Sequence, residues 1–284
     1  MTNVTYVGGC DWLCVPEWFS SEKDIEIVSE IGDWIPDKNK LSVFIDFSEP
    51  DWYLTTKTNE VLSRVDDFQL IVTRRPELLE YPQSEKLIAG ACWLSDEYRN
   101  NPNVNKEPSV SFTNTNKCMV YPWGFADGYD HRHSITRDWN ELQTLSNLPL
   151  HFYNSRKFPC PLEGMEIKFL DEHSKDSCMN HMFHIAVENA QSPNYITEKL
   201  IDCLAAKTIP IYYGCYNIHE YFDIDGILQF HTRDQLIDIL QNLTPEMYEE
   251  RKKVIDKNYE LSKKWWDTGA IFWKKVEERL NHAK

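Results

Sequence analysis

Residues 183–214 constrain the fold more than any other stretch of this 284-residue sequence. Residues 183–187 form a short apolar run, which is typical of a buried parallel strand. Residues 191–194 have turn composition, and a second apolar run covers 208–213. Between them, apolar residues recur at helical spacing, at Leu200, Ile201 and Leu204. The order strand, loop, helix, strand predicts a βαβ unit of a parallel sheet.

Polar side chains gather at the end of this unit where βαβ units bind ligands. Glu188 and Asn189 follow the first strand, and Tyr195, Glu198 and Lys199 open the helix. Free backbone N–H groups, the helix dipole and Lys199 favour an anion there. The Glu198 carboxylate is suited to accept hydrogen bonds from sugar hydroxyls. A diphosphate combined with hydroxyl groups describes a nucleotide sugar. The competing interpretation, an ordinary βαβ unit with a solvated helix start, leaves this clustering unexplained.

The same residues carry a family resemblance. Phe-x4-Glu-Asn, then Tyr-x-Thr-Glu-Lys, then Ile-Pro-x3-Gly resembles the donor-site motif of the α-1,3/4-fucosyltransferases, glycosyltransferase family 10. In this sequence the three parts begin at Phe183, Tyr195 and Ile209 and end at Gly214. The resemblance implies a GT-B-like α/β fold with two Rossmann-like domains facing a cleft. It also implies inverting, metal-independent transfer of fucose from GDP-fucose to a hydroxyl of a glycan acceptor.

The resemblance also suggests a catalytic base in the N-terminal third. The segment 41–51 is a strand that runs into a carboxylate-rich turn, and Ser48-Glu49-Pro50 is similar to a Glu-Ser-Pro-like turn of the family. The glutamate of that turn is thought to be the base, so Glu49 is the candidate and Asp46 the alternative. The competing interpretation is a turn of solvated acids.

A phosphate-binding arginine is expected near a second helix. Apolar spacing predicts a helix over 135–148. The family has an arginine just inside this helix that contacts the nucleotide phosphates, and the offset from Pro149 selects Arg137. Arg132 stays open as the alternative. The resemblance therefore gives a donor-binding set, which is Arg137, Asn189, Tyr195, Glu198 and Lys199.

Two segments contain residues that often bind metals, but neither has the pattern of a metal site. Asp130-His131-Arg132-His133 lacks the spacing of a zinc site, and Asp223-Ile-Asp225 has turn composition. The eight cysteines are scattered, with Cys10-x3-Cys14 as the one close pair. We therefore expect no metal and no cofactor beyond the donor substrate.

Composition excludes some classes of partner. A formal charge of −15 argues against general nucleic-acid binding, which needs a basic surface. No apolar run approaches the length of a membrane span, so we expect a soluble, cytoplasmic protein. A last helix is expected around Ile271 to Leu280, and the lysines and tryptophans of 263–266 and 273–275 leave peripheral membrane contact open. Packing of this helix onto the N-terminal domain is the favoured interpretation.

The expected organisation is an acceptor-side Rossmann-like domain over 1–108, a nucleotide-sugar domain over 109–255, and C-terminal helices over 256–284 that return to the first domain. The polar stretch 96–116 reads as the connection between the two. Two alternatives stay open. One is the same fold with another nucleotide deoxysugar as donor, and the other is a nucleotide-sugar-binding protein that has lost catalysis.

Overall fold

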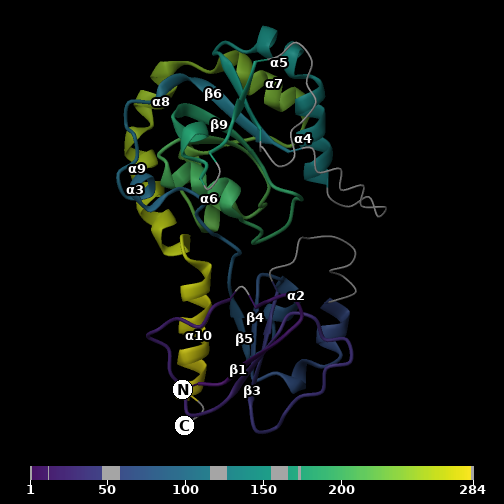
Figure 1. The fold of residues 1–284 in the computed structure, drawn as a ribbon. Helices are drawn as coiled ribbons and strands as arrows, with labels where there is room; N and C mark the ends of the chain where they lie inside the picture. Colours follow the sequence, from purple (N-terminus) through teal and green to yellow (C-terminus); the bar gives the residue numbers. More distant parts are fainter. Residues whose placement is uncertain are drawn as a thin grey trace. The chain divides into compact units, whose positions relative to one another are not determined.

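The computed structural model describes residues 2–11, 13–46, 58–115, 127–154, 166–171 and 174–282. The chain forms two compact units (Figure 1). Unit 1 comprises Met1–Ala89, Pro193–Tyr195 and Asp267–Lys284, and unit 2 comprises Gly90–Ser192 and Ile196–Trp266. Each unit holds one parallel β-sheet, so the predicted α/β class is confirmed. The boundaries expected at 108/109 and 255/256 stay predictions about folding domains.

The sheet of unit 1 has the strand order β1-β2-β3-β4-β5, and all neighbours pair in parallel. Its strands are β1 (Val4–Val7), β2 (Ile25–Val28), β3 (Leu41–Ile45), β4 (Leu70–Thr73) and β5 (Ser84–Lys86). Every residue of β2, β3 and β4 is buried. Burial on both faces explains why these strands read as mostly continuous apolar runs. The short helices η1 (Val65–Asp67) and α2 (Pro76–Leu79) follow β3 and β4.

The last helix, α10 (Thr268–His282), belongs to unit 1. Its aromatic side chains Phe272 and Trp273 are fully buried, and the Trp273 ring lies 4.6 Å from that of Phe19. Lys275 forms an ion pair of 3.1 Å with Glu85. The expected return of the C-terminal helix to the N-terminal part of the chain is therefore confirmed for α10. Among the described residues, we find no helix with the length and apolar character needed to cross a membrane.

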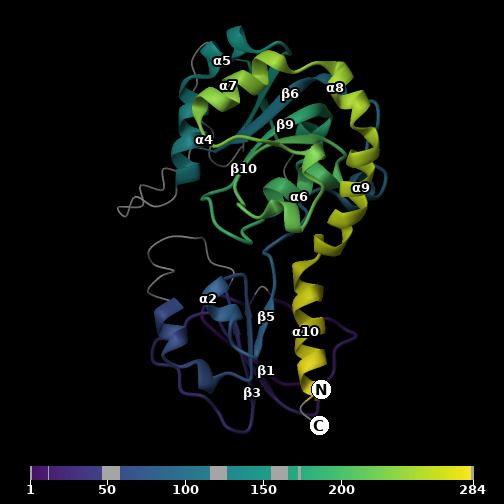
Figure 2. The ribbon, with the colours of Figure 1, turned by 180° about the vertical axis from the view of Figure 1, so that it is seen from behind.

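The sheet of unit 2 has the order β11-β10-β9-β6-β7-β8, again with parallel pairing throughout. Its strands are β6 (Glu107–Asn114), β7 (Leu150–Asn154), β8 (Ile167–Phe169), β9 (His181–Val187), β10 (Ile209–Tyr213) and β11 (Leu228–Gln229). β9 and β10 are in register from Phe183 opposite Ile209 to Val187 opposite Tyr213. With α6 (Glu198–Ala205) between them, they form the predicted βαβ unit, and α6 packs against both strands (Figure 2).

The helices of unit 2 are shorter than the sequence pattern suggests. The helix expected over 135–148 is two helices, α4 (Asp127–Arg137) and α5 (Trp139–Leu145), which meet at Asp138. The C-terminal half adds α7 (Arg233–Asn242), α8 (Pro245–Glu250) and α9 (Lys252–Ser262), and the N-terminal half adds α3 (Asp96–Asn100). Single turns complete the unit, at η2 (Asp176–Met179), η3 (Ile218–Glu220), η4 (Ile224–Gly226) and η5 (Lys263–Trp265).

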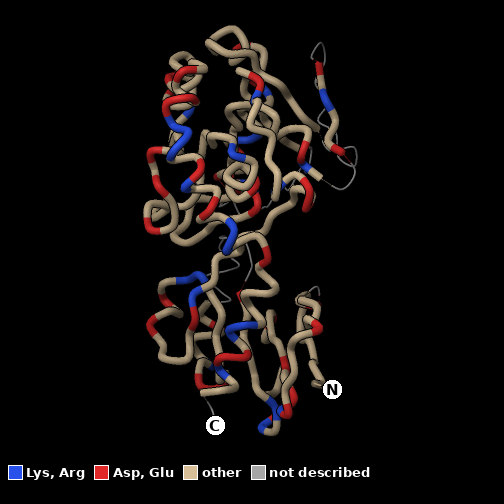
Figure 3. Tube along the Cα trace, turned by 90° about the vertical axis from the view of Figure 1, so that its left-hand side faces the viewer, with Lys and Arg blue, Asp and Glu red and all other residues tan. Residues whose placement is uncertain are grey.

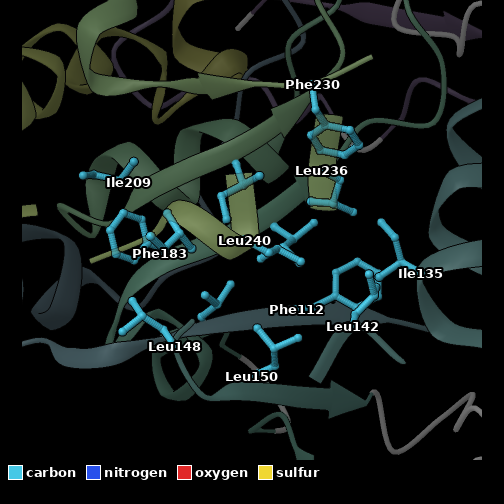
Figure 4. Close-up of a cluster of buried hydrophobic side chains, with 14 of the residues drawn as sticks. Phe112, Ile135, Leu142, Leu148, Leu150, Phe183, Ile209, Phe230, Leu236 and Leu240 are labelled. Atoms are coloured by element: carbon cyan, nitrogen blue, oxygen red, sulfur yellow. The ribbon is translucent and has the colours of Figure 1, made fainter. Parts of the chain in front are cut away.

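One core holds the sheet of unit 2 to α4, α5 and α7. Figure 4 shows Phe112 of β6 facing Ile135 and Leu142, with Leu236 and Leu240 of α7 beside them. All five side chains are at most 3% exposed. At about 1.5–3 kcal/mol for each buried side chain of this size, this core fixes the strand ends that carry the site.

The stretch 96–116 is not a loop connection, contrary to the prediction. It contains α3 and the strand β6, which lies between β9 and β7 inside the sheet. The hydroxyl groups of Ser109 and Ser111 in β6 are buried and have histidines of β9 as hydrogen-bond partners. Ser109 and Ser111 lie 2.7 and 2.8 Å from the Nδ1 atoms of His181 and His184.

Charged residues of both signs are interspersed along the chain of each unit (Figure 3). Because acidic residues outnumber basic ones by 45 to 30, an anionic ligand needs cations placed close to its binding site.

Candidate active site

The candidate site lies at the edge of the unit-2 sheet where the parallel strands end. β6 ends at Asn114, β7 at Asn154, and β9 is followed by Glu188 and Asn189. The N-terminus of α6 is at the same edge, because α6 directly follows the β9 loop. This is the edge at which open α/β sheets bind nucleotides.

Glu188 ties the end of β9 to the start of α6. Its side chain is fully buried, and its two carboxylate oxygens accept hydrogen bonds from the Thr197 backbone N–H at 2.9 Å and the Thr197 hydroxyl at 2.6 Å. Thr197 is the N-cap of α6, and its Oγ1 accepts a hydrogen bond from the backbone N–H of Lys199. Burial raises the pKa of Glu188, although Lys199 and the Thr197 hydrogen bonds oppose this. The sequence interpretation of Glu188 as a brace for the loop agrees with this geometry.

Two glycines make room for this brace. A Cβ atom on Gly214 would lie 2.5 Å from Cγ of Glu188 and would also clash with the hydroxyl of Tyr212. A Cβ atom on Gly128, in the first turn of α4, would overlap the backbone oxygen of Glu188. The Gly128 N–H donates a hydrogen bond of 3.1 Å to the backbone oxygen of Asn189. Absence of a side chain at these positions therefore lets β10 and α4 close on the end of β9.

Alternating charges line the first turn of α6. Lys199 Nζ lies 3.1 Å from Oε1 of Glu198 and 3.8 Å from Oε2 of Glu188. On the other side of Glu198, Lys175 Nζ lies 3.5 Å from the same carboxylate and 3.0 Å from Asp202. The side chains of Lys199, Glu198 and Lys175 are 20%, 13% and 15% exposed, so the row is close to the surface without being solvated.

The charges around the start of α6 shift the pKa values of Glu198 and Lys175. Burial alone would raise the pKa of Glu198, but the ammonium groups of Lys199 and Lys175 outweigh burial and lower that pKa to about 2. Asp202 and Glu198 raise the pKa of Lys175 in spite of its burial. Lys175 was not predicted from the sequence, because it lies in a polar segment without a motif and reaches α6 only through the fold.

The structure places the two candidate arginines very differently. Arg132 Nη2 donates to Oδ1 of Asn189 at 2.5 Å, and its guanidinium lies 4.2 Å from the centre of the Tyr129 ring. Its Nε is buried and has no hydrogen-bond partner among the described residues. The Arg137 side chain is instead 73% exposed and pairs with the neighbouring Asp138. The fold thus brings Arg132, and not Arg137, to the end of β9.

The remaining candidates belong to unit 1. Tyr195 is buried, with the guanidinium of Arg74 stacked 4.8 Å from the centre of its ring. Asn194, whose φ is 60°, donates a hydrogen bond of 2.8 Å to the backbone oxygen of Arg74. Asp46 is buried at the end of β3 and accepts a hydrogen bond of 2.5 Å from Arg75 Nε. Glu49 lies outside the described residues.

The two segments considered for metal binding have other contacts. The His131 ring packs 4.3 Å from the ring of Tyr213, and burial lowers the pKa of His131. Asp223 caps η4 and forms an ion pair of 2.7 Å with Lys257, which lowers the pKa of Asp223.

Comparison with known proteins finds similarity to one family over the part of the chain that holds α5 to α9. Residues 140–267 match the family model described as glycosyltransferase family 10 (fucosyltransferase), C-terminal. The alpha-(1,3)-fucosyltransferase FucT of Helicobacter pylori is 28% identical over 99 residues, which cover 34% of this chain and 20% of that protein. The match therefore spans about one-fifth of the length of this curated relative.

Solved structures share the fold. An α1,3-fucosyltransferase crystallised with GDP is similar with a TM-score of 0.50 and 15% identity, over 94% of this chain and 79% of that one. TarM is similar with a TM-score of 0.58 and 10% identity, over 91% and 55%. Such low identities establish the fold alone. The structure thus has the GT-B-like α/β fold of these neighbours, and its residues 140–267 are similar to the C-terminal part of glycosyltransferase family 10 (fucosyltransferase).

Proposed function

We propose that the protein is an inverting, metal-independent fucosyltransferase that moves fucose from GDP-fucose to a hydroxyl of a glycan acceptor. One observation carries the proposal. Lys199 at the N-terminus of α6 and Arg132 beside Asn189 supply two cations at the strand ends of a parallel sheet, in a chain that matches a fucosyltransferase family model.

The two cations suit a diphosphate leaving group. As the bond between the sugar and the diphosphate breaks, negative charge grows on the phosphate oxygens. Lys199, Arg132 and the positive end of the α6 dipole stabilise that charge, which is the part a metal ion plays in other transferases. We assign the phosphate contact to Arg132 and not to Arg137, because Arg132 lies at Asn189 whereas the Arg137 side chain is 73% exposed.

Polar neighbours of these cations orient the donor. Glu198 stays ionised because Lys199 and Lys175 lower its pKa to about 2, so it accepts hydrogen bonds from sugar or ribose hydroxyls. Asn189 presents an amide beside Arg132 for the same purpose. Tyr195 keeps the donor-binding role that the family resemblance implies. Glu188 does not touch the donor but holds Thr197, and with it the start of α6.

A carboxylate completes the reaction. It takes the proton of the acceptor hydroxyl while that oxygen bonds to the anomeric carbon from the face opposite the diphosphate, so the configuration inverts. General-base assistance of this kind contributes about 10²–10⁴ in rate. We propose Glu49 as the base, because the Asp46 carboxylate is already buried and paired with Arg75.

Paired variants test the proposal. Glu49→Gln should bind GDP-fucose like the wild type in calorimetry but lose transfer to a panel of glycan acceptors by at least about 100-fold. Asp46→Asn serves as the matched comparison. Transfer that survives in the first variant and disappears in the second would move the base to Asp46.

The wild-type protein should also bind GDP-fucose more tightly than GDP-mannose or UDP-sugars. Preference for a different deoxysugar nucleotide would change the assigned donor, and donor binding without transfer would indicate a binding protein. Transfer should continue in EDTA, and a strict manganese requirement would contradict the metal-independent mechanism.

A further inference from the structure

A second group of chemically active side chains lies at the opposite edge of the unit-2 sheet. Because the strands are parallel, their first residues meet at that edge, where Glu107 opens β6, His181 opens β9 and His151 is the second residue of β7. We propose that these three residues bind a divalent transition-metal ion of the zinc class.

The ligand spacing supports this site. One ligand atom from each of Glu107, His151 and His181 lies within 4.8 Å of the other two. Nδ1 of His181 is 3.4 Å from Oε2 of Glu107. A tetrahedral zinc ion with bonds of about 2.0–2.1 Å holds its ligand atoms about 3.4 Å apart. This pair therefore already has the separation of two zinc ligands, and His151 needs a shift of roughly 1 Å to join them.

His181 is oriented as metal-binding histidines usually are. Its side chain is 1% exposed, and Nε2 lies 2.8 Å from the hydroxyl of Tyr153, which fixes the ring and leaves Nδ1 toward Glu107. The Ser109 hydroxyl is 2.7 Å from Nδ1, and it also lies 3.4 Å from the backbone oxygen of Glu107. A metal ion bound to Nδ1 therefore has to displace this hydroxyl, which then hydrogen-bonds to that backbone oxygen instead.

Nearby charges act in both directions on a cation at this site. Lys168 opposes it, whereas the carboxylates of Glu107 and Glu166 favour it.

The site is independent of donor chemistry. His181 and Val187 are six residues apart on β9, so the two ends of the strand are separated by about 20 Å. An ion held by Glu107, His151 and His181 would link the starts of three adjacent strands, β9, β6 and β7, and would stabilise unit 2 without taking part in transfer.

Zinc titration of EDTA-treated, reduced protein tests the proposal. Calorimetry should show one Zn²⁺ site in the wild type, and zinc should raise its melting temperature. Glu107→Gln and His151→Ala change side chains that are not fully buried, and each should weaken binding by at least about 10–100-fold, the range seen when even outer-shell partners are removed.

Two control variants remove side chains that can bind zinc but do not belong to the cluster. His219→Ala removes an exposed histidine far from the cluster in sequence, and Cys14→Ser removes an exposed thiol. Both should bind Zn²⁺ like the wild type. Absence of measurable zinc binding in the wild type, or unchanged binding in Glu107→Gln and His151→Ala, would overturn the proposal whatever the transferase assays show.

Discussion

Replacing Glu198 with glutamine measures how much the ion pairs of this carboxylate with Lys199 and Lys175 stabilise the folded protein. Glu198 lies 3.1 Å from Lys199 Nζ and 3.5 Å from Lys175 Nζ. Glutamine has nearly the same shape as a protonated glutamate, so the variant removes the charge and keeps the volume. Its effect on the free energy of unfolding should therefore equal the net benefit of ionising Glu198 in the folded state.

The pKa of Glu198 gives the size of that benefit. The value falls from 4.5 to about 2, because the two ammonium groups outweigh the opposing effect of burial. Each unit by which the pKa is lowered corresponds to about 1.4 kcal/mol of stabilisation. The free energy of unfolding at pH 7 should therefore fall by about 3 kcal/mol in the variant. The folded-state pKa lies below the ordinary one. This stabilisation is therefore complete above pH 4.5 and is lost as the pH falls from 4.5 toward 2.

Urea unfolding followed by tryptophan fluorescence can measure this difference at pH 7. Glu250→Gln is a suitable control, because Glu250 is exposed on α8 in the same unit and should change stability by less than about 0.5 kcal/mol. If Glu198→Gln were as stable as this control, the ion pairs with Lys199 and Lys175 would carry no net free energy, and the reasoning would fail.

Three further substitutions follow from the same site. Lys199→Ala should abolish transfer and should weaken GDP binding in calorimetry. Circular dichroism should show that this variant is folded. Full turnover in the variant would show that Lys199 does not stabilise the phosphates. Arg132→Ala should weaken GDP binding by about 1.5–3 kcal/mol, the usual value of a charged hydrogen bond, whereas the matched Arg137→Ala should bind GDP normally. Gly214→Ala should lower the free energy of unfolding by about 1–3 kcal/mol in urea titrations, because the new Cβ meets Glu188, and an unchanged value would contradict that contact.

The central βαβ unit was predictable from the sequence because its signals are local. The apolar run of β9, the helical spacing after Thr197 and the run of β10 each depend on neighbours in the chain, and all three elements lie where the pattern places them. Glu188 was readable for the same reason, since it follows a strand and precedes a capped helix.

Other parts depend on long-range contacts that no local pattern contains. β6 reads as a polar loop, but Ser109 and Ser111 are buried opposite His181 and His184 of β9. Without those partners, a buried hydroxyl would be costly, so the sequence alone favours exposure. Lys175 reaches Glu198 across 23 positions of the chain by the same kind of tertiary contact.

The arginine was ambiguous because α4 and α5 read as one continuous helix. An offset counted back from Pro149 selects Arg137, but α4 ends at Arg137 and α5 begins at Trp139, so the counted stretch is not one helix. The structure places Arg132 on α4, within reach of Asn189. Helix breaks without proline or glycine give little signal in a sequence, so the offset could not distinguish the two arginines.

The charge balance at the start of α6 sets a condition on donor binding. Lys175 and Lys199 carry two positive charges, whereas Glu188, Glu198 and Asp202 carry three negative charges when all are ionised. This cluster is therefore negative by one charge before a diphosphate arrives, and the guanidinium of Arg132 only brings the sum to zero. Binding of a doubly charged anion is most favourable if one carboxylate takes up a proton.

Glu188 is the group best placed to take up that proton. Burial already raises its pKa, and Lys199, 3.8 Å away, is the main group that opposes the rise. A diphosphate that draws the Lys199 ammonium away and adds negative charge raises the pKa of Glu188 further. GDP binding at pH 7 should thus be accompanied by proton uptake, which calorimetry in buffers of different ionisation enthalpy measures directly. Glu188→Gln should bind GDP without this uptake, and equal proton uptake in the variant and the wild type would show that the proton goes elsewhere.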